Sequence, residues 1–369
     1  MARIVLIGPV KPFRGGIAHS TTLLAEKLSK KNELLVLSFS RLFPKLLYPG
    51  KFQREKGAPP KGIRTEFCID SVNPVSWVKA VRKIKEFGAG VVVFEWWTTF
   101  LAPCYWFIAS KANARVSVVC QNVLPHEKNS IHSFLTRAFL SKADSFVTLA
   151  KSDEKLLRVI IPSARVRTII EPTYESITGK KAVPKKQARK KLGLKGKNFI
   201  LFFGFVRPYK GLEYLLKAMP LVEKNVHLMI VGEFWEPREK FKALIRELGL
   251  GKRVKIVDRY VSDKETALYF GAADCVVLPY VSSTESGIIQ LAFGYNKPVI
   301  TTSVGGNPDL IEHGKNGLLV EPEKPAELAK AINHFYGRKL EQKFKREMKK
   351  KTKEFKWNKE KEKIVLGEF

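Results

Sequence analysis

The chain has 369 residues, of which 66 are Lys or Arg and 35 are Asp or Glu, so its formal net charge is +31. Apolar residues make up 45% and charged residues 27%, proportions that exclude a disordered chain and are typical of a globular protein. One hydrophobic core seldom serves more than about 300 residues, so the length predicts two domains. The positive charge favours anionic partners: phosphorylated substrates, nucleic acid or an acidic membrane surface.

No run of about 18 uncharged apolar residues occurs, so we expect no membrane-spanning helix. The first apolar run, Arg3–Ile7, has the pattern of a buried strand rather than of a signal peptide, which predicts a cytoplasmic protein. Cys68, Cys104, Cys120 and Cys275 lie beside apolar runs with no His at metal spacing, which indicates buried free thiols. We therefore expect no metal site and no bound cofactor. The preference for Lys and Glu over Gln is typical of proteins from hot environments.

Short apolar runs alternate with amphipathic stretches along the chain, the pattern of parallel sheets with crossover helices. We predict an α/β protein with Rossmann-like domains at 1–171 and 198–340, a linker at 172–197, and a helical segment at 341–369 that could return to the first domain. Strands are expected at Arg3–Ile7, Leu34–Phe39, Val91–Glu95, Val116–Val119, Ser145–Leu149, Phe199–Phe203, Val226–Val231, Val254–Val257, Cys275–Leu278 and Val299–Thr301. Helices are expected at Ala18–Ser29, Val75–Phe87, Phe100–Ala112, Asp153–Ile160, Leu212–Met219, Arg238–Leu248, Lys264–Phe270 and Gly287–Tyr295.

Ligands of such sheets bind at the carboxyl ends of the strands, so the loops after strands should carry the function. After the first strand, Gly15 and Gly16 directly precede a helix. Paired glycines let a phosphate or a sugar approach backbone N–H groups and the positive helix end. Their spacing is not that of the dinucleotide motif GxGxxG, and a tight turn fits the pattern as well as a binding loop does.

Two loops of the second domain have residues suited to an anionic sugar compound. Arg207 and Lys210 lie three residues apart on a strand-to-helix loop and could grip a diphosphate, although a solvated basic loop is the alternative. Ser286 and Gly287 start an apolar helix whose first N–H groups suit an anion, and Glu285 just before them suits sugar hydroxyls. The alternative for this segment is a polar helix cap.

Several motifs of the second domain occur in one order that resembles the donor-binding domain of family 4 glycosyltransferases, the glycosyl transferases group 1. They are Arg207-x-x-Lys210-Gly211, Val231-Gly232-Glu233, Ser286-Gly287, Lys297-Pro298-Val299-Ile300, Val304-Gly305-Gly306-Asn307-Pro308-Asp309 and Gly314-x-x-Gly317-Leu318-Leu319-Val320. The Gly15-Gly16 loop, Glu95-Trp96-Trp97-Thr98 and the segment 121–127 are similar to segments of the family's first domain. The resemblance implies a retaining enzyme of GT-B fold, in which two Rossmann-like domains face each other across a cleft.

In this family a nucleotide-diphosphate sugar docks on the second domain and an acceptor on the first, without a metal ion. The resemblance implies that Arg207 and Lys210 neutralise the departing diphosphate of a UDP-, GDP- or ADP-sugar. The remaining donor-binding positions that it implies are Gly15, Gly16, Gly204, Gly232, Glu233, Tyr260, Val261, Ser286, Gly287, Ile288 and Gln290. Tyr260 and Val261 are expected to frame the base.

Two departures from the family pattern concern catalytic positions. The family's paired Glu residues would fall on Ser283 and Leu291, so Glu285 could meet the sugar and Gln290 the ribose in their place. The family often has His where this chain has Gln121, which leaves His126 as the imidazole available for catalysis, a buried structural histidine being the alternative.

The acceptor is not evident from the sequence. Basic and large apolar residues interleave at Arg41–Lys51, and Val75–Phe87 is a basic amphipathic helix pattern. Such segments can lie on an anionic bilayer, which would place the enzyme on the inner membrane face beside a lipid-linked acceptor. The alternative is that the aromatic residues are core and the lysines solvated.

Two other functions are compatible with parts of the pattern. Related folds that bind the same donors include sugar-nucleotide epimerases and sugar-phosphate synthases. The net charge would also suit a nucleic-acid-binding protein, but no RNP, KH, zinc-finger or helix-turn-helix signature occurs, so no nucleic-acid partner is expected.

Overall fold

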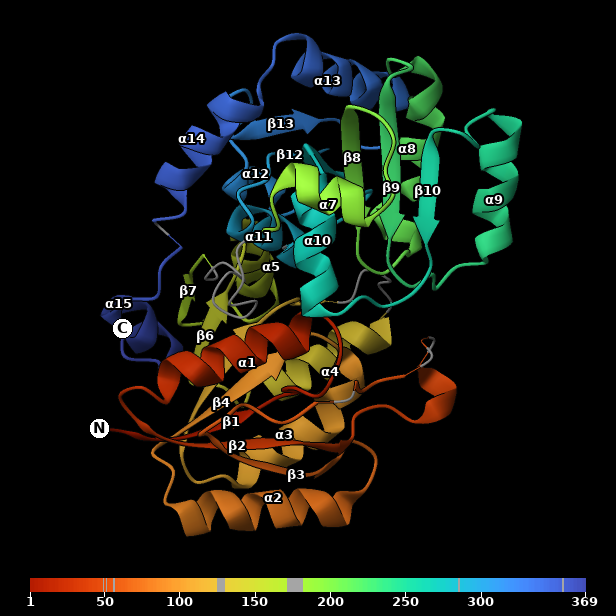
Figure 1. The fold of residues 1–369 in the computed structure, drawn as a ribbon. Helices are drawn as coiled ribbons and strands as arrows, with labels where there is room; N and C mark the ends of the chain where they lie inside the picture. The colour runs from red at the N-terminus through yellow and green to blue at the C-terminus, as the bar shows by residue number, and fades with distance from the viewer. Residues whose placement is uncertain are drawn as a thin grey trace. The chain divides into compact units, whose positions relative to one another are not determined.

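The computed structural model describes residues 1–48, 50, 52–55, 57–124, 130–170, 182–284, 286–353 and 355–369. The chain forms two compact units, unit 1 with Met1–Ile170 and Trp357–Phe369, and unit 2 with Glu171–Lys356. Each unit is an α/β structure built on one parallel sheet (Figure 1). Within the described residues no helix reaches the length and apolarity that crossing a bilayer requires.

Unit 1 contains a seven-stranded sheet in the order β3-β2-β1-β4-β5-β6-β7, and every pairing is parallel. Its strands are β1 (Arg3–Ile7), β2 (Glu33–Arg41), β3 (Arg64–Asp70), β4 (Val91–Trp96), β5 (Arg115–Cys120), β6 (Ser145–Thr148) and β7 (Val166–Thr168). Its helical segments are α1 (Gly16–Leu28), η1 (Lys45–Leu47), α2 (Pro74–Phe87), η2 (Thr99–Leu101), α3 (Ala102–Lys111), α4 (Ser130–Leu140), α5 (Lys151–Ile160) and α15 (Lys359–Val365).

Helices cover both faces of this sheet because successive strand residues point to opposite sides. Ile4 and Leu6 of β1 belong to a core cluster with residues of α1 and with Val365 of α15. Val5 and Ile7 of the same strand belong to a second cluster with residues of α2 and α3. The last helix of the chain therefore packs on the unit that contains the first strand.

Unit 2 contains a six-stranded parallel sheet in the order β10-β9-β8-β11-β12-β13. Its strands are β8 (Asn198–Phe203), β9 (Val226–Val231), β10 (Val254–Val257), β11 (Cys275–Leu278), β12 (Val299–Thr302) and β13 (Gly317–Val320). Its helical segments are α7 (Lys185–Lys191), η3 (Pro208–Lys210), α8 (Leu212–Ala218), η4 (Met219–Leu221), α9 (Arg238–Glu247), α10 (Asp263–Ala272), α11 (Gly287–Gly294), α12 (Asn307–Leu310), α13 (Pro325–Gly337) and α14 (Glu341–Lys351).

The strands and helices predicted from periodicity are confirmed, with ends that shift by a few residues. The sequence did not predict β3, β7 and β13, nor helices α4, α12, α13, α14 and α15 as separate elements. The segment expected as a linker contains helix α7, which packs against α10, while its residues 172–181 lie outside the described part of the chain. The four cysteines are free thiols, with Cys104, Cys120 and Cys275 buried and Cys68 half-buried.

The strand order reverses at one point in each sheet. In unit 1 the chain leaves β1 towards β2 on one side and later returns to β4 on the other, and in unit 2 β8 has the same position between β9 and β11. Loops leave such a point in opposite directions and open a crevice at the carboxyl ends of the strands, where ligands of open α/β sheets bind. This topology makes the loops after β1 and β4, and those after β8 and β11, the places to look for sites.

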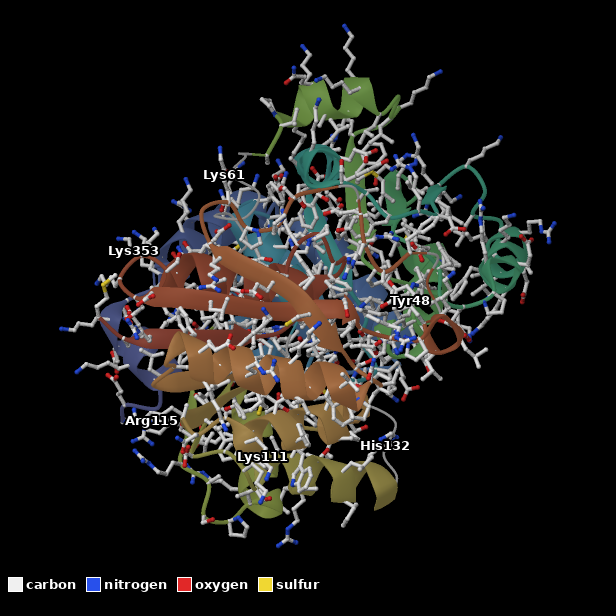
Figure 2. All side chains as sticks on the ribbon, turned by 90° about the horizontal axis from the view of Figure 1, so that it is seen from below. Tyr48, Lys61, Lys111, Arg115, His132 and Lys353 are labelled. Carbon is white, nitrogen blue, oxygen red and sulfur yellow. The ribbon has the colours of Figure 1, made fainter. Side chains whose placement is uncertain are left out.

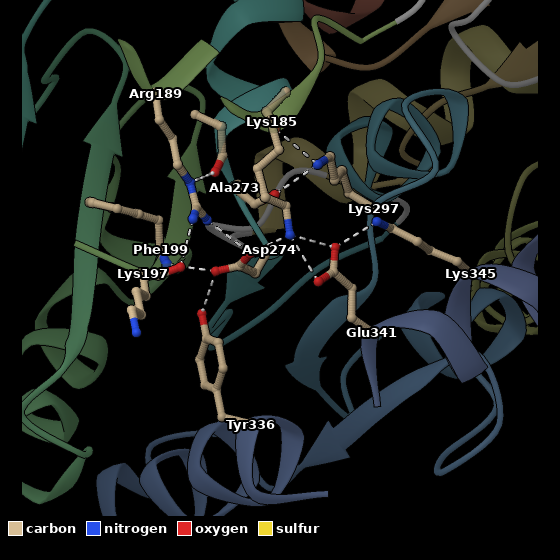
Figure 3. A network of polar contacts seen from close by, with 12 residues as sticks. Lys185, Arg189, Lys197, Phe199, Ala273, Asp274, Lys297, Tyr336, Glu341 and Lys345 are labelled. Carbon is tan, nitrogen blue, oxygen red and sulfur yellow. Dashed lines mark hydrogen bonds and ion pairs between the residues drawn. The ribbon is translucent and has the colours of Figure 1, made fainter. Parts of the chain in front are cut away.

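A charged network ties together the opposite, amino-terminal edge of the unit 2 sheet (Figure 3). Asp274 directly precedes β11 and is almost fully buried. It accepts hydrogen bonds from Lys185 Nζ at 2.6 Å, Arg189 Nη2 at 2.9 Å, the Phe199 backbone N–H at 2.7 Å and the Tyr336 hydroxyl at 3.1 Å. These four donors come from α7, β8 and α13, so one carboxylate joins three elements to the start of β11.

Glu341 and Lys297 extend this network. Glu341 of α14 accepts a hydrogen bond from Lys185 Nζ at 2.8 Å. Lys297 is buried and donates to the carbonyl oxygens of Gly271 at 3.2 Å and Ala273 at 2.7 Å. Burial lowers the pKa of the Lys297 ammonium to about 7. At this edge of the sheet, the buried polar side chains are therefore hydrogen-bonded to protein partners.

Replacement of Asp274 should lower the free energy of unfolding of unit 2. Asp274→Ala leaves the Arg189 guanidinium and the Phe199 N–H without their buried acceptor, so we expect a loss of about 3 kcal/mol in the free energy of unfolding. Urea denaturation measures it. Glu239→Ala, which removes an exposed carboxylate paired with Lys242 on α9, is the control and should leave the midpoint unchanged. Equal midpoints for the two variants would show that the network is not stabilising.

Candidate functional site

Glycine allows the loops after β8 and β9 to touch. Gly204 directly follows β8, and its N–H donates to the Val231 carbonyl oxygen at 3.0 Å. Gly232 directly follows β9 with φ +152°, and a Cβ at this position would lie 1.9 Å from the Gly204 carbonyl oxygen. No larger residue fits there without moving the backbone. The two loops are therefore held side by side at the carboxyl edge of the sheet.

A second close approach crosses the point at which the strand order reverses. Gly211 ends the loop after β8 with φ +66°, and a Cβ there would lie 1.9 Å from the Pro279 carbonyl oxygen in the loop after β11. The Val281 N–H of that loop donates to the Tyr209 carbonyl oxygen at 2.8 Å. Backbone contacts thus join the two loops that leave β8 and β11.

Lys210 reaches across the same point. Its Nζ donates to the Tyr280 hydroxyl at 2.8 Å, and Ser286 Oγ donates to the same phenol oxygen at 3.2 Å. Tyr280 and Ser286 are buried, and burial raises the pKa of the Tyr280 phenol, which keeps it neutral. Burial also lowers the pKa of the Lys210 ammonium. The hydrogen bonds therefore position the Lys210 ammonium without cancelling its charge.

Arg207 lies on the rings of two aromatic residues. Its guanidinium carbon is 5.4 Å from the ring centroid of Tyr209 and 5.2 Å from that of Trp235. Trp235 in turn packs on Phe205, with ring centroids 4.6 Å apart, and Phe205 lies 6.4 Å from the Tyr260 ring. Contacts of a cation with aromatic faces are worth about 0.5–1 kcal/mol at exposed sites. The contacts with the two rings thus hold the exposed guanidinium in one position at the edge of the sheet.

The start of α11 completes this edge of unit 2. Ser286 is the residue before the helix, and the first N–H groups of a helix have no partner within it. A Cβ on Gly204 would lie 3.5 Å from Ile288 Cδ1, so the first turn of α11 contacts the loop after β8. Gln290 is fully buried in the same helix.

The structure brings most of the expected donor-binding residues together at one edge of unit 2. Those that lie at the carboxyl ends of β8, β9, β10 and β11 are Gly204, Arg207, Lys210, Gly232, Glu233, Tyr260, Val261, Ser286, Gly287 and Ile288. Gly15 and Gly16 belong to unit 1, where Gly16 begins α1. Glu285 and His126 lie outside the described residues.

Three contributors to this edge were not foreseen from the sequence: Tyr209, Trp235 and Tyr280. Each is an aromatic residue in a loop directly after a strand, a position that by itself also suits ordinary core packing. Their contacts with Arg207 and Lys210 join residues of different loops, so no local pattern in the sequence marks them.

The chemistry of this edge suits an anion, and we call it the candidate anion site. Among the described residues, none of the ion pairs involves Arg207 or Lys210, in contrast to the matched charges around Asp274. Two cations and the start of a helix suit the oxygens of a diphosphate. In the same described ranges no group of His, Cys, Asp or Glu residues could hold a metal ion.

Residues 184–355, which include the whole candidate anion site, match the model of the family described as glycosyl transferases group 1. This part of the chain is thus similar to that family. An uncharacterized glycosyltransferase of Methanocaldococcus jannaschii is 34% identical over 149 residues, which are 39% of this chain and 37% of that protein. The matches span about a third to a half of the length of the curated relatives.

Solved structures extend the likeness to both units. Sucrose-phosphate synthase from Thermosynechococcus elongatus has a TM-score of 0.75 at 20% identity, over 100% of this chain and 97% of that one. HepE of Anabaena, in complex with UDP-glucose, has a TM-score of 0.74 at 18% identity, over 95% of this chain and 94% of the other. At these identities the likeness concerns the fold, and the fold expected from the sequence is confirmed: two Rossmann-like halves of the GT-B type.

Proposed function

We propose that this protein is a glycosyltransferase that moves a sugar from a nucleotide-diphosphate sugar to a hydroxyl acceptor, with retention of anomeric configuration. The observation that carries the proposal is the pair of cations Arg207 and Lys210, positioned by aromatic residues beside the start of α11. The match of residues 184–355 to the glycosyl transferases group 1 model supports the proposal. Because HepE was solved with UDP-glucose, this is the first donor to test, before GDP- and ADP-sugars.

The proposed role of the two cations follows from where charge develops. As the bond between the sugar and the diphosphate breaks, the sugar becomes cationic and negative charge collects on the leaving phosphate. Preorganised donors stabilise that charge more than they stabilise the ground state, and this difference lowers the barrier. The planar guanidinium of Arg207 can contact two phosphate oxygens, while Lys210 supplies a point charge. In this proposal Glu285 meets the sugar hydroxyls.

Calorimetric titration with UDP-, GDP- and ADP-glucose, followed by NMR of the product's anomeric configuration, tests the assignment. The assignment would be supported if one donor binds and the product keeps the anomeric configuration of that donor. If the protein instead releases an epimer of the nucleotide sugar when no acceptor is present, it would be an epimerase. Failure of every nucleotide sugar to bind would remove the proposed function.

Substitution of either cation should slow transfer more than it weakens donor binding. Removing one preorganised stabiliser typically costs on the order of 10²–10³ in rate, so Lys210→Ala should lower kcat by about that factor. Arg207→Lys should also lower kcat, because an ammonium cannot reproduce the guanidinium fork. The two losses should be less than additive, since both act on one leaving group. Steady-state kinetics at saturating donor measure this.

Lys217→Ala on α8 is the matched control, because Lys217 is paired with Glu213 on the surface of the same unit. Its kcat should be unchanged. A double variant of Arg207 and Lys210 that folds and keeps the kcat of the unmodified protein would exclude this loop as the diphosphate site.

We further propose that catalysis needs no divalent metal, because Arg207 and Lys210 supply the positive charge. Turnover of the donor should therefore survive EDTA at a concentration well above that of any trace metal. The comparison is the same assay after dialysis, with and without added Mg²⁺ or Mn²⁺. Complete loss of activity that either ion restores would contradict the proposal.

A membrane surface is the proposed location of the acceptor, with the protein in the cytoplasm and peripheral on the inner face. The segment around η1 follows β2 and has exposed apolar side chains next to Lys45. Tyr48, directly after η1, marks the place of this segment in Figure 2. The exposed fractions are 95% for Leu46, 56% for Leu47 and 69% for Phe52. Exposed apolar residues beside Lys45 suit insertion among anionic headgroups, which would bring the enzyme to a lipid-linked acceptor.

Co-sedimentation with vesicles tests this location. The protein should pellet with vesicles that contain anionic lipid, should stay in the supernatant with neutral ones, and should be released by salt because exposed charges are screened. Leu46→Ser should reduce the bound fraction several-fold. Leu221→Ser is the control, since Leu221 is 58% exposed in unit 2. Equal loss in the two variants, or equal binding to both vesicles, would contradict a role for η1.

A further inference from the structure

The reversal point of the unit 1 sheet holds a buried carboxylate. Glu95, near the end of β4, is fully buried. Gly8, just after β1, leaves room for it: a Cβ on Gly8 would lie 3.0 Å from Glu95 Cβ and 2.9 Å from Thr21 Cγ2. β1 and β4 are the strands between which the order reverses, so this carboxylate lies where open α/β sheets bind ligands.

Glu95 and Ser20 together determine the orientation of a glutamine amide. Gln121 directly follows β5, and its Nε2 donates to Glu95 Oε2 at 3.1 Å and to Ser20 Oγ at 2.7 Å. The Glu95 oxygen accepts this hydrogen bond, so the amide turns its nitrogen towards Glu95. Both amide hydrogens are then used by two buried partners from β4 and α1. The Gln121 carbonyl oxygen is left pointing away from both.

This oxygen is available to a ligand. Gln121 is part-exposed, whereas its two partners are buried, and no hydrogen bond among the described residues uses its Oε1. A carbonyl oxygen accepts hydrogen bonds from hydroxyl groups but cannot take up a proton at neutral pH. A residue of this kind can orient a hydroxyl without deprotonating it.

We propose that Gln121 Oε1 accepts a hydrogen bond from a hydroxyl of a sugar or polyol bound at the carboxyl edge of unit 1, and that Glu95 and Ser20 are positioning residues that act through Gln121. The inference rests on the proposed function in one respect, because the polyol would be the acceptor of the transferred sugar. It assigns to unit 1 a recognition element for hydroxyl groups that is built from β4, β5 and α1.

The test separates acceptor recognition from donor turnover. The donor is UDP-glucose, and the acceptor probes are D-inositol 3-phosphate and a set of methyl glycopyranosides. The rate of hydrolysis of the donor by water is measured in parallel. Gln121→Met, which keeps the size but removes the amide, should raise the KM of the best probe about 3- to 10-fold, the effect of losing one hydrogen bond. The donor KM and the hydrolysis rate should not change.

A double-variant cycle tests whether Glu95 acts through Gln121. Glu95→Gln frees the amide to turn over and should raise the acceptor KM by a similar factor. The variant that combines Glu95→Gln with Gln121→Met should be no worse than Gln121→Met alone. If Glu95→Gln does not fold, Ser20→Ala replaces it in the cycle. Ser20→Ala removes the other partner of the amide and should also raise the acceptor KM. Ser38→Ala, a buried serine of β2, is the control and should leave the acceptor KM unchanged.

Additive losses in the cycle, or equal increases in donor and acceptor KM, would show that Glu95 only stabilises the fold and would overturn the inference. Hydrolysis of the donor with no binding or glycosylation of any probe would also overturn it, while the donor half of the proposed function would survive. Absence of both hydrolysis and transfer with every nucleotide sugar would instead reject the proposed function itself.

Discussion

The hydrogen bond from Lys210 to Tyr280 is the contact on which the candidate site of unit 2 depends. It spans the point where the strand order reverses, so it links loops that leave the sheet in opposite directions. Gly211 makes it possible, since a side chain there would collide with the Pro279 carbonyl oxygen. Ser286 shares the phenol oxygen and thereby joins the start of α11 to the same contact.

Charged side chains have different partners at the two edges of the unit 2 sheet. At the amino edge, Asp274 is surrounded by donors from three elements, and buried ions that are fully paired hold those elements together. At the carboxyl edge, Lys210 and Arg207 are positioned by neutral aromatic residues, which leaves their charge available. A folded domain tolerates unmatched cations where solvent or an anionic ligand reaches them. The contrast distinguishes the edge that holds the candidate site independently of any motif.

Unit 1 uses the same topology with a different chemistry. Its reversal point carries a buried carboxylate, a serine hydroxyl and an oriented amide. Cations suit phosphate oxygens, whereas amide and hydroxyl groups suit other hydroxyl groups. The two units thus share one architecture but differ in the polar groups that lie at their reversal points.

The sequence by itself determined the α/β class, the strands of both sheets that are buried on two faces, and the order of loops with Arg207, Lys210 and Ser286. These features are local, because a buried parallel strand is a short continuous apolar run and a strand-to-helix loop is marked by its glycines. It missed β3, an edge strand that is mostly half-exposed and therefore has no continuous apolar run. Only the tertiary structure decided which side chains meet: Tyr280 with Lys210, Trp235 with Arg207, and Glu95 with Gln121. Those partners lie on different strands or loops, and their contacts arise when the sheets assemble, so no spacing along the chain encodes them.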